Sequence, residues 1–463
     1  MFWVRAALWV GLLVILAAAC GKDSAVRVAE RVLDDHRRKA AARPLPAAGS
    51  IRVRLLPSTP DAAEKGSLEI EWENGRYRET VTSAGATRVR GIQGGKAFFT
   101  DEDGVTRVGS EPMLAELVTR SYFWRRAYLF ADRERARLGL GPTDERSASV
   151  RLRPRGGNEM LLSFERVSGS LQSVVSPRLR LDFESAARFR DLGAGGVIGQ
   201  IAWTGLPTRR LPDPSVGGAR GRFAQAPAEA EITEAADGIS IGARIGGVAA
   251  ALSVDAGQSG PLRLSPELAR RAGLSGRRDV FGRLLGDGAT LEIGSFTAPG
   301  LWYEIAEPGA PGIDAVAGAT LYRETVVDID PASRRLRLHD PARFAAPEGF
   351  GRNVLDDDGD VPVAILFRTG RPVRLRAGAR DSSPLLLSPA AAAEFGADPK
   401  SRTLSGLVWG TLRLPPLPFR ADDSRYDADW GNDGAIGFPL LLRFHTITDM
   451  PHRWIYVRGA SAD

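Results

Sequence analysis

The sequence has little of the residues on which many active sites and small secreted folds depend. It contains one cysteine, Cys20, among 463 residues, which excludes a disulfide framework within the chain. Its four histidines, His36, His339, His445 and His452, have none of the short spacings that bind zinc. We therefore expect no metal centre and no catalytic histidine, and we assign the histidines surface or structural roles.

Other absences narrow the function further. The 62 Lys and Arg residues against 56 Asp and Glu give a net charge of only +6, and no basic stripe with interleaved aromatic residues predicts a nucleic-acid partner. The glycine-rich stretch Gly193–Gly196 lacks the Lys-Ser/Thr of a phosphate-binding loop. The acidic run Asp356–Asp360 lacks the Glu at the twelfth position of a calcium loop, so we expect it to be solvated. The sequence predicts no cofactor.

The first residues are typical of an export signal. Arg5 precedes an apolar run, residues 6–15, that is shorter than the about 20 apolar residues needed to span a bilayer. We therefore predict a signal peptide at residues 1–20. The small residues before the lone cysteine resemble the lipobox of bacterial lipoproteins, which implies that Cys20 is lipidated and anchors the chain to a membrane. A plain signal peptide or an uncleaved anchor is the alternative.

The same resemblance implies a location. In lipoproteins, an Asp directly after the lipidated cysteine favours the inner membrane, and this chain has Gly21 there. The implied location is the bacterial cell envelope, on the outer membrane and facing the periplasm.

The following part is rich in strand patterns. Residues 21–48 predict a charged helical spacer. Residues 49–205 contain many alternating apolar runs, hairpin signals such as Asn74-Gly75 and one amphipathic helix at Met113–Phe130. This meander of strands resembles the half-barrel of envelope lipoprotein-carrier proteins, so we expect a β-rich, half-barrel-like domain. The Pro-, Gly- and Ala-rich residues 206–238 predict a linker.

A two-part pattern then occurs twice. The first copy reads Ala256-Gly257 followed by Pro261–Pro266, and the second reads Ala377-Gly378 followed by Pro384–Pro389. Both hexapeptides have the form Pro-Leu-X-Leu-Ser-Pro, and a helical run follows each of them. A search for internal repeats therefore finds two related units before any fold is named.

The closing half of each unit recurs as well. An apolar-apolar-glycine segment ends at Gly318 and again at Gly437, and Asp330 and Asp449 each follow twelve positions later. The first unit resembles the catalytic turn and closing segment of retropepsin-like aspartic peptidases, and two such units in one chain resemble the bilobal layout of pepsin. The resemblance implies a mainly β fold with retropepsin-like lobe 1 at residues 239–345, a linker at 346–360 and retropepsin-like lobe 2 at 361–458.

The resemblance assigns the catalytic role to Asp255 of Asp255-Ala256-Gly257. Ala256 stands where the family has threonine, and matching the two Ala-Gly pairs puts Arg376 of Arg376-Ala377-Gly378 where the partner aspartate is expected. Aspartic peptidases need two facing carboxylates that share a proton, one acting as base and the other as acid. A guanidinium there would instead hold Asp255 ionised, with an attraction of about 4 kcal/mol at 4 Å in an effective dielectric of 20.

The sequence therefore indicates a catalytically degenerate site whose cleft binds an extended peptide or protein by strand addition. An active aspartic endopeptidase is the alternative, with Asp255 and an unusual partner such as Asp381 on a shifted loop. In a third interpretation, both lobes are structural supports for the first domain.

Overall fold

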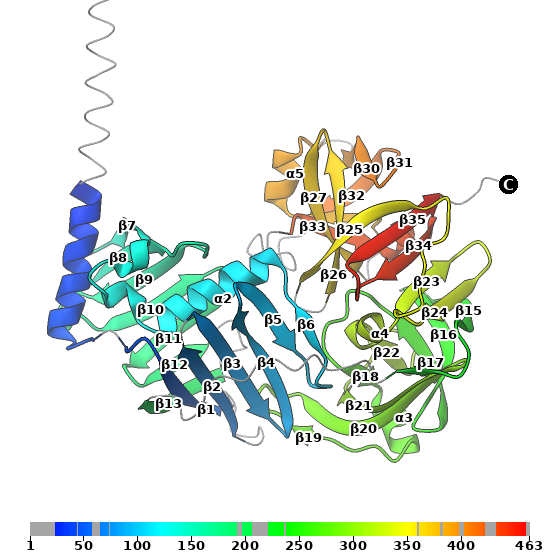
Figure 1. Ribbon diagram of the computed structural model, residues 1–463, viewed down its shortest axis with the longest axis horizontal. Coiled ribbons are helices and arrows are strands. Elements are labelled where there is room, and N and C mark those ends of the chain that lie inside the picture. Colours follow the sequence, from blue (N-terminus) through cyan, green and yellow to red (C-terminus); the bar gives the residue numbers. More distant parts are fainter. Residues whose placement is uncertain are drawn as a thin grey trace, which may run out of the picture.

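The structure is a computed structural model that describes residues 24–43, 45–57, 65–73, 75–191, 197–205, 221–235, 238–358, 361–379, 383–397, 402–421 and 432–459. The predicted signal peptide and Cys20 lie outside the described residues. The fold is mainly β, as predicted, and has an N-terminal sheet domain beside two further β-rich lobes (Figure 1). None of the helices in the described ranges is both long and apolar enough to cross a membrane.

The N-terminal domain is built on one antiparallel sheet of thirteen strands. The chain runs outward from β1 to β6 and returns through β7 to β13, which pairs with β1 and so joins the two halves. The strands are β1 (Gly49–Leu56), β2 (Gly66–Glu73), β3 (Arg76–Ser83), β4 (Ala86–Gln93), β5 (Lys96–Thr100), β6 (Thr106–Val108), β7 (Arg137–Thr143), β8 (Ser147–Arg153), β9 (Met160–Glu165), β10 (Leu171–Ser176), β11 (Leu179–Ser185), β12 (Arg188–Asp191) and β13 (Val197–Gly205).

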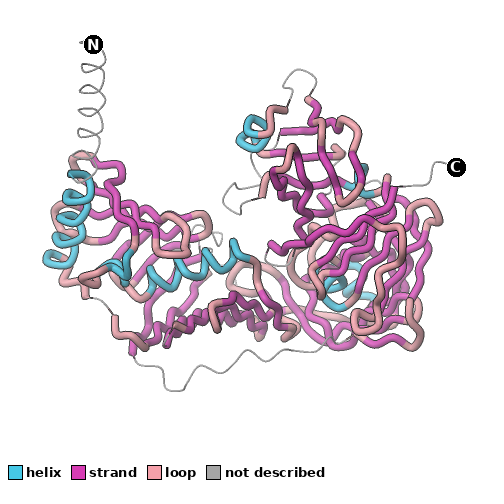
Figure 2. The backbone as a smooth tube through the Cα atoms, turned by 45° about the horizontal axis from the view of Figure 1, so that its top comes forward, coloured by secondary structure: helices cyan, strands magenta, loops and turns pink. Residues whose placement is uncertain are grey.

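Two helical segments pack against this sheet. Residues 24–39 form the predicted N-terminal helix, and α2 (Glu111–Trp124) runs along the sheet (Figure 2). The predicted helix to Phe130 is interrupted because Arg126 adopts a left-handed conformation with φ of 52°, and η1 (Ala127–Leu129) and η2 (Arg133–Arg135) follow as 3₁₀ turns. The helices and the sheet share one apolar core.

Lobe 1 contains eleven of the described strands and two helices. They are β14 (Arg222–Phe223), β15 (Ala228–Ala235), β16 (Gly238–Ile245), β17 (Val248–Val254), β18 (Leu262–Leu264), α3 (Pro266–Arg271), β19 (Arg277–Arg278), β20 (Leu284–Ile293), β21 (Phe296–Ile305), β22 (Ala315–Ala317), α4 (Ala319–Glu324), β23 (Val326–Asp330) and β24 (Arg335–His339).

Lobe 2 also contains eleven of the described strands and two helices, in a similar order. They are β25 (Gly351–Asp358), β26 (Val361–Arg368), β27 (Arg371–Ala379), β28 (Leu385–Leu387), α5 (Pro389–Glu394), β29 (Thr403–Leu404), β30 (Leu407–Trp409), β31 (Leu412–Arg413), β32 (Leu417–Ala421), β33 (Gly434–Gly437), α6 (Phe438–Leu441), β34 (Phe444–Asp449) and β35 (Trp454–Gly459).

The two lobes have the same strand pairing around one central strand. In lobe 1, β22 lies between β17 and β18 and pairs parallel with the first and antiparallel with the second. In lobe 2, β33 lies in the same way between β27 and β28. The repeat found in the sequence is therefore also a repeat of topology.

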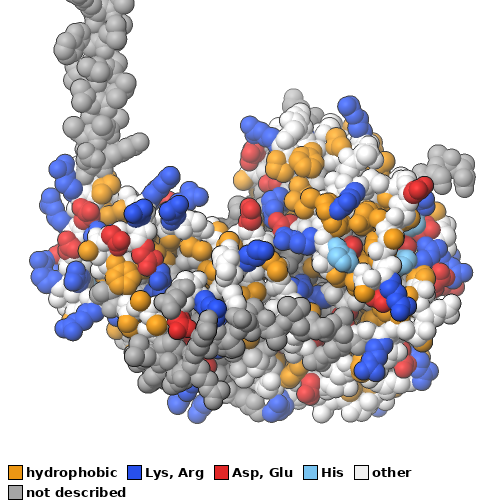
Figure 3. Space-filling view, viewed as in Figure 1, with side chains coloured by type: hydrophobic (Ala, Val, Ile, Leu, Met, Phe, Trp, Pro, Cys, Tyr) orange, Lys and Arg blue, Asp and Glu red, His pale blue; other side chains and the backbone are white. Residues whose placement is uncertain are grey.

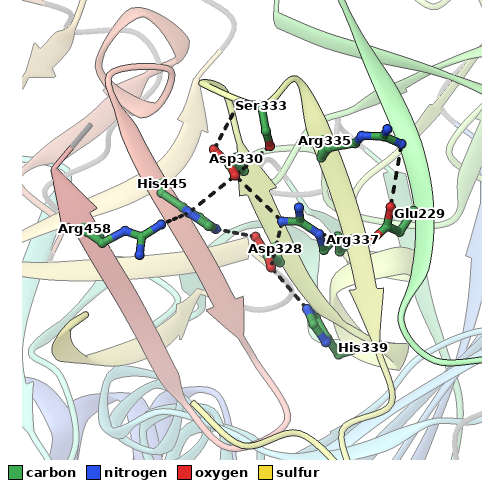
Figure 4. A network of polar contacts seen from close by, with 9 residues as sticks. All are labelled: Glu229, Asp328, Asp330, Ser333, Arg335, Arg337, His339, His445 and Arg458. Carbon is green, nitrogen blue, oxygen red and sulfur yellow. Dashed lines mark hydrogen bonds and ion pairs between the residues drawn. The ribbon is translucent and has the colours of Figure 1, made fainter. Parts of the chain in front are cut away.

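A six-stranded antiparallel sheet joins the lobes in the order β15-β24-β23-β34-β35-β25. Segments predicted as linkers contribute its two outer strands, because β15 lies within residues 206–238 and β25 within residues 346–360. At its centre Asp328 contacts two histidines: His445 Nε2 lies 2.7 Å from one carboxylate oxygen and His339 Nε2 lies 3.2 Å from the other (Figure 4). The lobes are thus connected by backbone pairing and by a buried polar network.

Charged side chains of both signs are spread over the visible face of the molecule (Figure 3). Lys and Arg lie beside Asp and Glu on the N-terminal domain and on both lobes.

Candidate functional site

The Asp255 turn, residues Asp255–Gly257, follows the buried strand β17. Asp255 is 4% exposed, and its Oδ1 accepts a hydrogen bond of 2.9 Å from the Gly257 N–H. Its backbone N–H donates to Ala317 O on β22 at 3.0 Å, and its carbonyl oxygen accepts from the Gln258 N–H. The carboxylate is therefore held at a strand end by the turn itself, which is the local geometry predicted from the sequence.

Gly318 packs directly behind this turn. A Cβ atom at Gly318 would lie 2.1 Å from Gln258 O and 2.7 Å from Asp255 O. Only glycine lets the backbone approach so closely. The residue after it, Ala319, donates its N–H to Gln258 O at 2.9 Å and begins α4. The apolar-apolar-glycine segment thus supports the turn from behind.

The strand register corrects the alignment of the second copy. Ser253 pairs with Val316 on β22, and Arg376 pairs with Ala435 at the same level of β33. Arg376 is therefore the counterpart of Ser253, two residues before Asp255. By the same spacing of 123 residues, Asp255 corresponds to Gly378, which lies at a bulge in β27 where the pairing passes from Ala377 to Ala379.

The correction has a simple physical reason. Ser253 and Arg376 are 123 residues apart, and Leu264 and Leu387, which pair at matching levels of β22 and β33, are also 123 residues apart. No two-residue insertion lies between these points, although matching the Ala-Gly pairs requires one. Strand pairing fixes the register, because a shift by an odd number of residues turns side chains to the other face and any shift breaks the ladder.

The two turns meet at the contact between the lobes. A Cβ atom at Gly257 would lie 2.5 Å from Gly378 O, and one at Gly378 would lie 2.7 Å from Gly257 N and 3.0 Å from Ala256 Cβ. Gly378 also has a φ of 81°, which side-chain-bearing residues rarely adopt. Ala377 beside it is 3% exposed. Ala256 and Gly257 of one turn and Gly378 of the other are therefore in close contact.

Tyr322 on α4 lies close enough to Asp255 to sense its charge. Burial, and then the negative charge of Asp255, raise the pKa of Tyr322 well above its ordinary value. The phenol therefore stays protonated at neutral pH, as a hydroxyl that can donate a hydrogen bond. No local sequence pattern identifies this residue, since only the fold brings α4 to the turn.

Two further carboxylates were missed by sequence reasoning. Asp314 Oδ2 accepts the Ala251 N–H at 2.9 Å, and Asp433 Oδ2 accepts the Arg374 N–H at 2.8 Å. Each Asp stands four residues before the glycine of the apolar-apolar-glycine segment. Burial raises the pKa of Asp433. The repeat could have identified this pair, because both the residue type and its spacing recur.

The remaining predicted residues are placed as follows. Arg376 is half-buried on β27 and pairs with Val363 of β26. Asp381, the alternative catalytic partner, lies outside the described residues, as does Cys20. Within the ranges that the structure describes, no group of three or more His, Cys, Asp or Glu side chains could hold a metal ion. His339 and His445 contact Asp328 between the lobes, and His452 caps a turn through Asp449.

Comparisons with known proteins identify no family from sequence. No protein-family model matches the chain, and no curated protein matches it. Among solved structures, the chain is similar to the aspartic proteinase from Irpex lacteus, with 12% sequence identity and a TM-score of 0.34. The similarity covers 51% of this chain and 98% of the proteinase. It is a distant structural similarity to an aspartic proteinase over half the chain.

Proposed function

We propose that the two lobes form a peptide-binding module that does not hydrolyse its ligand. The observation that carries this proposal is that Gly378, at the position that corresponds to Asp255 by sequence spacing, lies in backbone contact with Gly257 of the Asp255 turn. Asp255 offers a carboxylate at its position, and Gly378 offers only backbone at the corresponding one. Strand addition along the lobes would bind an extended peptide through main-chain hydrogen bonds, without any need for a second titratable group.

The two turns lack a second acid–base group at the position of Gly378. Amide hydrolysis by two carboxylates needs a base for the attacking water and an acid for the carbonyl oxygen. Gly378 can serve as neither, and Ala256 has no hydroxyl. Since a fold alone does not define an activity, the residues at the two turns decide the proposal.

The test uses the soluble protein that begins at Ser24 and a library of unstructured peptides between pH 3 and pH 7. We expect binding without cleavage, and we expect Asp255→Asn to bind the same peptides, because the carboxamide keeps the acceptor for the Gly257 N–H. Cleavage that disappears in Asp255→Asn would instead make the protein an aspartic endopeptidase. In that case Asp381→Asn, tested in parallel, identifies whether Asp381 is the partner.

We also propose that the protein is a lipoprotein of the bacterial envelope, anchored through Cys20. This rests on the apolar run, the small residues and the lone cysteine of the sequence. Metabolic labelling with a fatty acid in a bacterial host tests it. Label in the wild type and none in Cys20→Ser is the expected result, and label in neither is the contrary one.

A further inference from the structure

The N-terminal domain docks on lobe 1 through an acidic turn, residues Asp101–Asp103, between β5 and β6. Asp101 Oδ2 lies 2.5 Å from Arg323 Nη1 on α4, and Asp103 Oδ1 accepts the Trp302 N–H of β21 at 2.9 Å. Glu102 pairs with Arg88 of its own domain. The side chains of Asp101 and Arg323 are 0% and 1% exposed, so their ion pair is shielded from water.

A second contact between the N-terminal domain and lobe 1 lies beside the acidic turn. Val280, in the turn between β19 and β20, is 2% exposed and belongs to the apolar core of the N-terminal domain. Its N–H donates to Ser83 Oγ at 2.7 Å, and Arg277 Nη2 donates to Ala84 O at 2.9 Å. The docking surface therefore combines an inserted apolar side chain with a buried ion pair.

Helix α4 connects this surface to the Asp255 turn. Its first residue, Ala319, donates to Gln258 O, and Thr320 Oγ1 donates to Gly260 O at 3.4 Å. The charge of Asp255 reaches Tyr322 and helps to raise the pKa of its phenol, and Arg323 is the next residue. The six-residue helix α4 thus contacts the segment of the Asp255 turn at one end and the N-terminal domain at the other.

The second lobe supplies an internal control for this arrangement. Counted from Gly318 and Gly437, the counterpart of Arg323 is Leu442, which packs against the core of the lobes. An arginine is rarely buried without an opposite charge. Arg323 therefore needs the acidic turn as its partner, whereas Leu442 needs no charged partner.

We propose that Arg323 is a positioning residue, through which the docked N-terminal domain holds the Asp255 turn in its peptide-binding geometry. The inference rests on the proposed peptide binding for its functional part. The mechanical part, the link from Asp101 to the turn, stands independently of any ligand.

Native-state hydrogen exchange of the soluble protein from Ser24 tests the mechanical part. Arg323→Leu leaves Asp101 buried without its counter-charge, and we expect amide exchange in residues 255–260 and in α4 to accelerate at least tenfold. Arg323→Lys keeps the charge, and Asp101→Leu with Arg323→Leu replaces the pair by apolar side chains, so both should stay near the wild-type rate.

Arg120→Leu is the matched control, because Arg120 forms a buried ion pair with Glu79 inside the N-terminal domain, at 2.7 Å. We expect it to destabilise that domain while residues 255–260 exchange at the wild-type rate. Wild-type exchange of residues 255–260 in Arg323→Leu, or equal acceleration in Arg120→Leu, overturns the proposal.

Peptide affinity of the same variants tests the functional part. We expect Arg323→Leu to weaken binding about tenfold, or about 1.4 kcal/mol, and Arg323→Lys and the double variant to bind like the wild type. Accelerated exchange without any loss of affinity would restrict Arg323 to a structural role and overturn its part in binding. If the wild type binds no peptide at all, the proposed function fails, and the exchange experiment still decides whether the link exists.

Discussion

Lobe 1 and lobe 2 share one topology and differ in the residues placed at its equivalent points. Asp255, Arg323 and Asp328 of lobe 1 correspond to Gly378, Leu442 and Ile447 of lobe 2. Each of these three differences puts a charged side chain in lobe 1 and an apolar or absent one in lobe 2, whereas Ser253 and Arg376 place the charge in lobe 2. The comparison teaches that the scaffold needs none of these charges to fold, because lobe 2 forms the same strand pairings without them.

The contact between the two turns provides the largest expected effect. We expect Gly378→Ala to destabilise the protein by about 2–4 kcal/mol, because it combines a strained φ with a clash against the Gly257 backbone. Gly370→Ala is the control, since Gly370 has the same φ of 81° with no atom within 4 Å, and it should cost only about 1 kcal/mol. Urea unfolding measures both, and equal losses would show that the turns do not touch.

The Asp328 network between the lobes gives a pH-dependent effect. Burial raises the pKa of Asp328, but hydrogen bonds from His339 and His445 and the charges of His445 and Arg337 outweigh it and hold the pKa at about 2. A folded-state pKa below the ordinary value of 3.8 stabilises the protein above about pH 4, and this stabilisation is lost as the pH falls toward 2.

Asp328→Asn should therefore lower the free energy of unfolding by about 2 kcal/mol above pH 4, with the difference from wild type shrinking toward pH 2. Chemical unfolding at several pH values measures it. A difference that is constant with pH would contradict the assignment. Ile447→Val, at the partner position across the sheet, is the control and should show no such pH dependence.

Asp314 and Asp433, which precede the central strands β22 and β33 in sequence, should contribute similarly to stability. Asp314→Ala and Asp433→Ala each leave a backbone N–H without its acceptor, and we expect a loss of about 1–3 kcal/mol in each case. The Asn variants keep an acceptor oxygen and should lose much less. A large loss in one lobe only would break the structural equivalence of the two central strands.

The smallest expected effect comes from the N-cap serines of α3 and α5, and it should be the same in both lobes. Ser265 Oγ accepts the Leu268 N–H at the start of α3, and Ser388 Oγ accepts the Ala391 N–H at the start of α5, both at 3.1 Å. Replacing either serine by alanine should cost about 1 kcal/mol, the ordinary value of a helix N-cap. Thermal unfolding of the two variants should agree closely, and a clear difference would indicate that the helices are supported unequally.

Much of this architecture was predictable from the sequence, because it depends on local patterns. The hairpin signals, the Asp255 turn and the repeated Pro-Leu-X-Leu-Ser-Pro segments all describe short stretches of chain, and the structure contains strands and helices there. The mainly β class followed directly. The signal peptide, Cys20 and Asp381 stay predictions.

The failures have a common origin in pairing between distant segments. The composition of residues 206–238 predicts a linker, yet they contain β15, because the partner that makes it a strand, β24, lies at the far end of lobe 1. Arg376 was aligned with Asp255 through an Ala-Gly match, although constant spacing in the stronger motif already favoured Gly378. The roles of Arg323 and Tyr322 depend on which surfaces meet, and no local pattern encodes that.

The sheet that joins the lobes also constrains the order in which its strands can pair while the chain is being synthesised. Strand β25 opens lobe 2, yet its partner β35 closes that lobe, with Gly351 paired to Val457. Likewise β15, near the start of lobe 1, pairs with β24 at the end of that lobe. During synthesis, therefore, the edge of β25 that receives β35 stays unpaired until the rest of lobe 2 has been made, and such edges can pair with other chains.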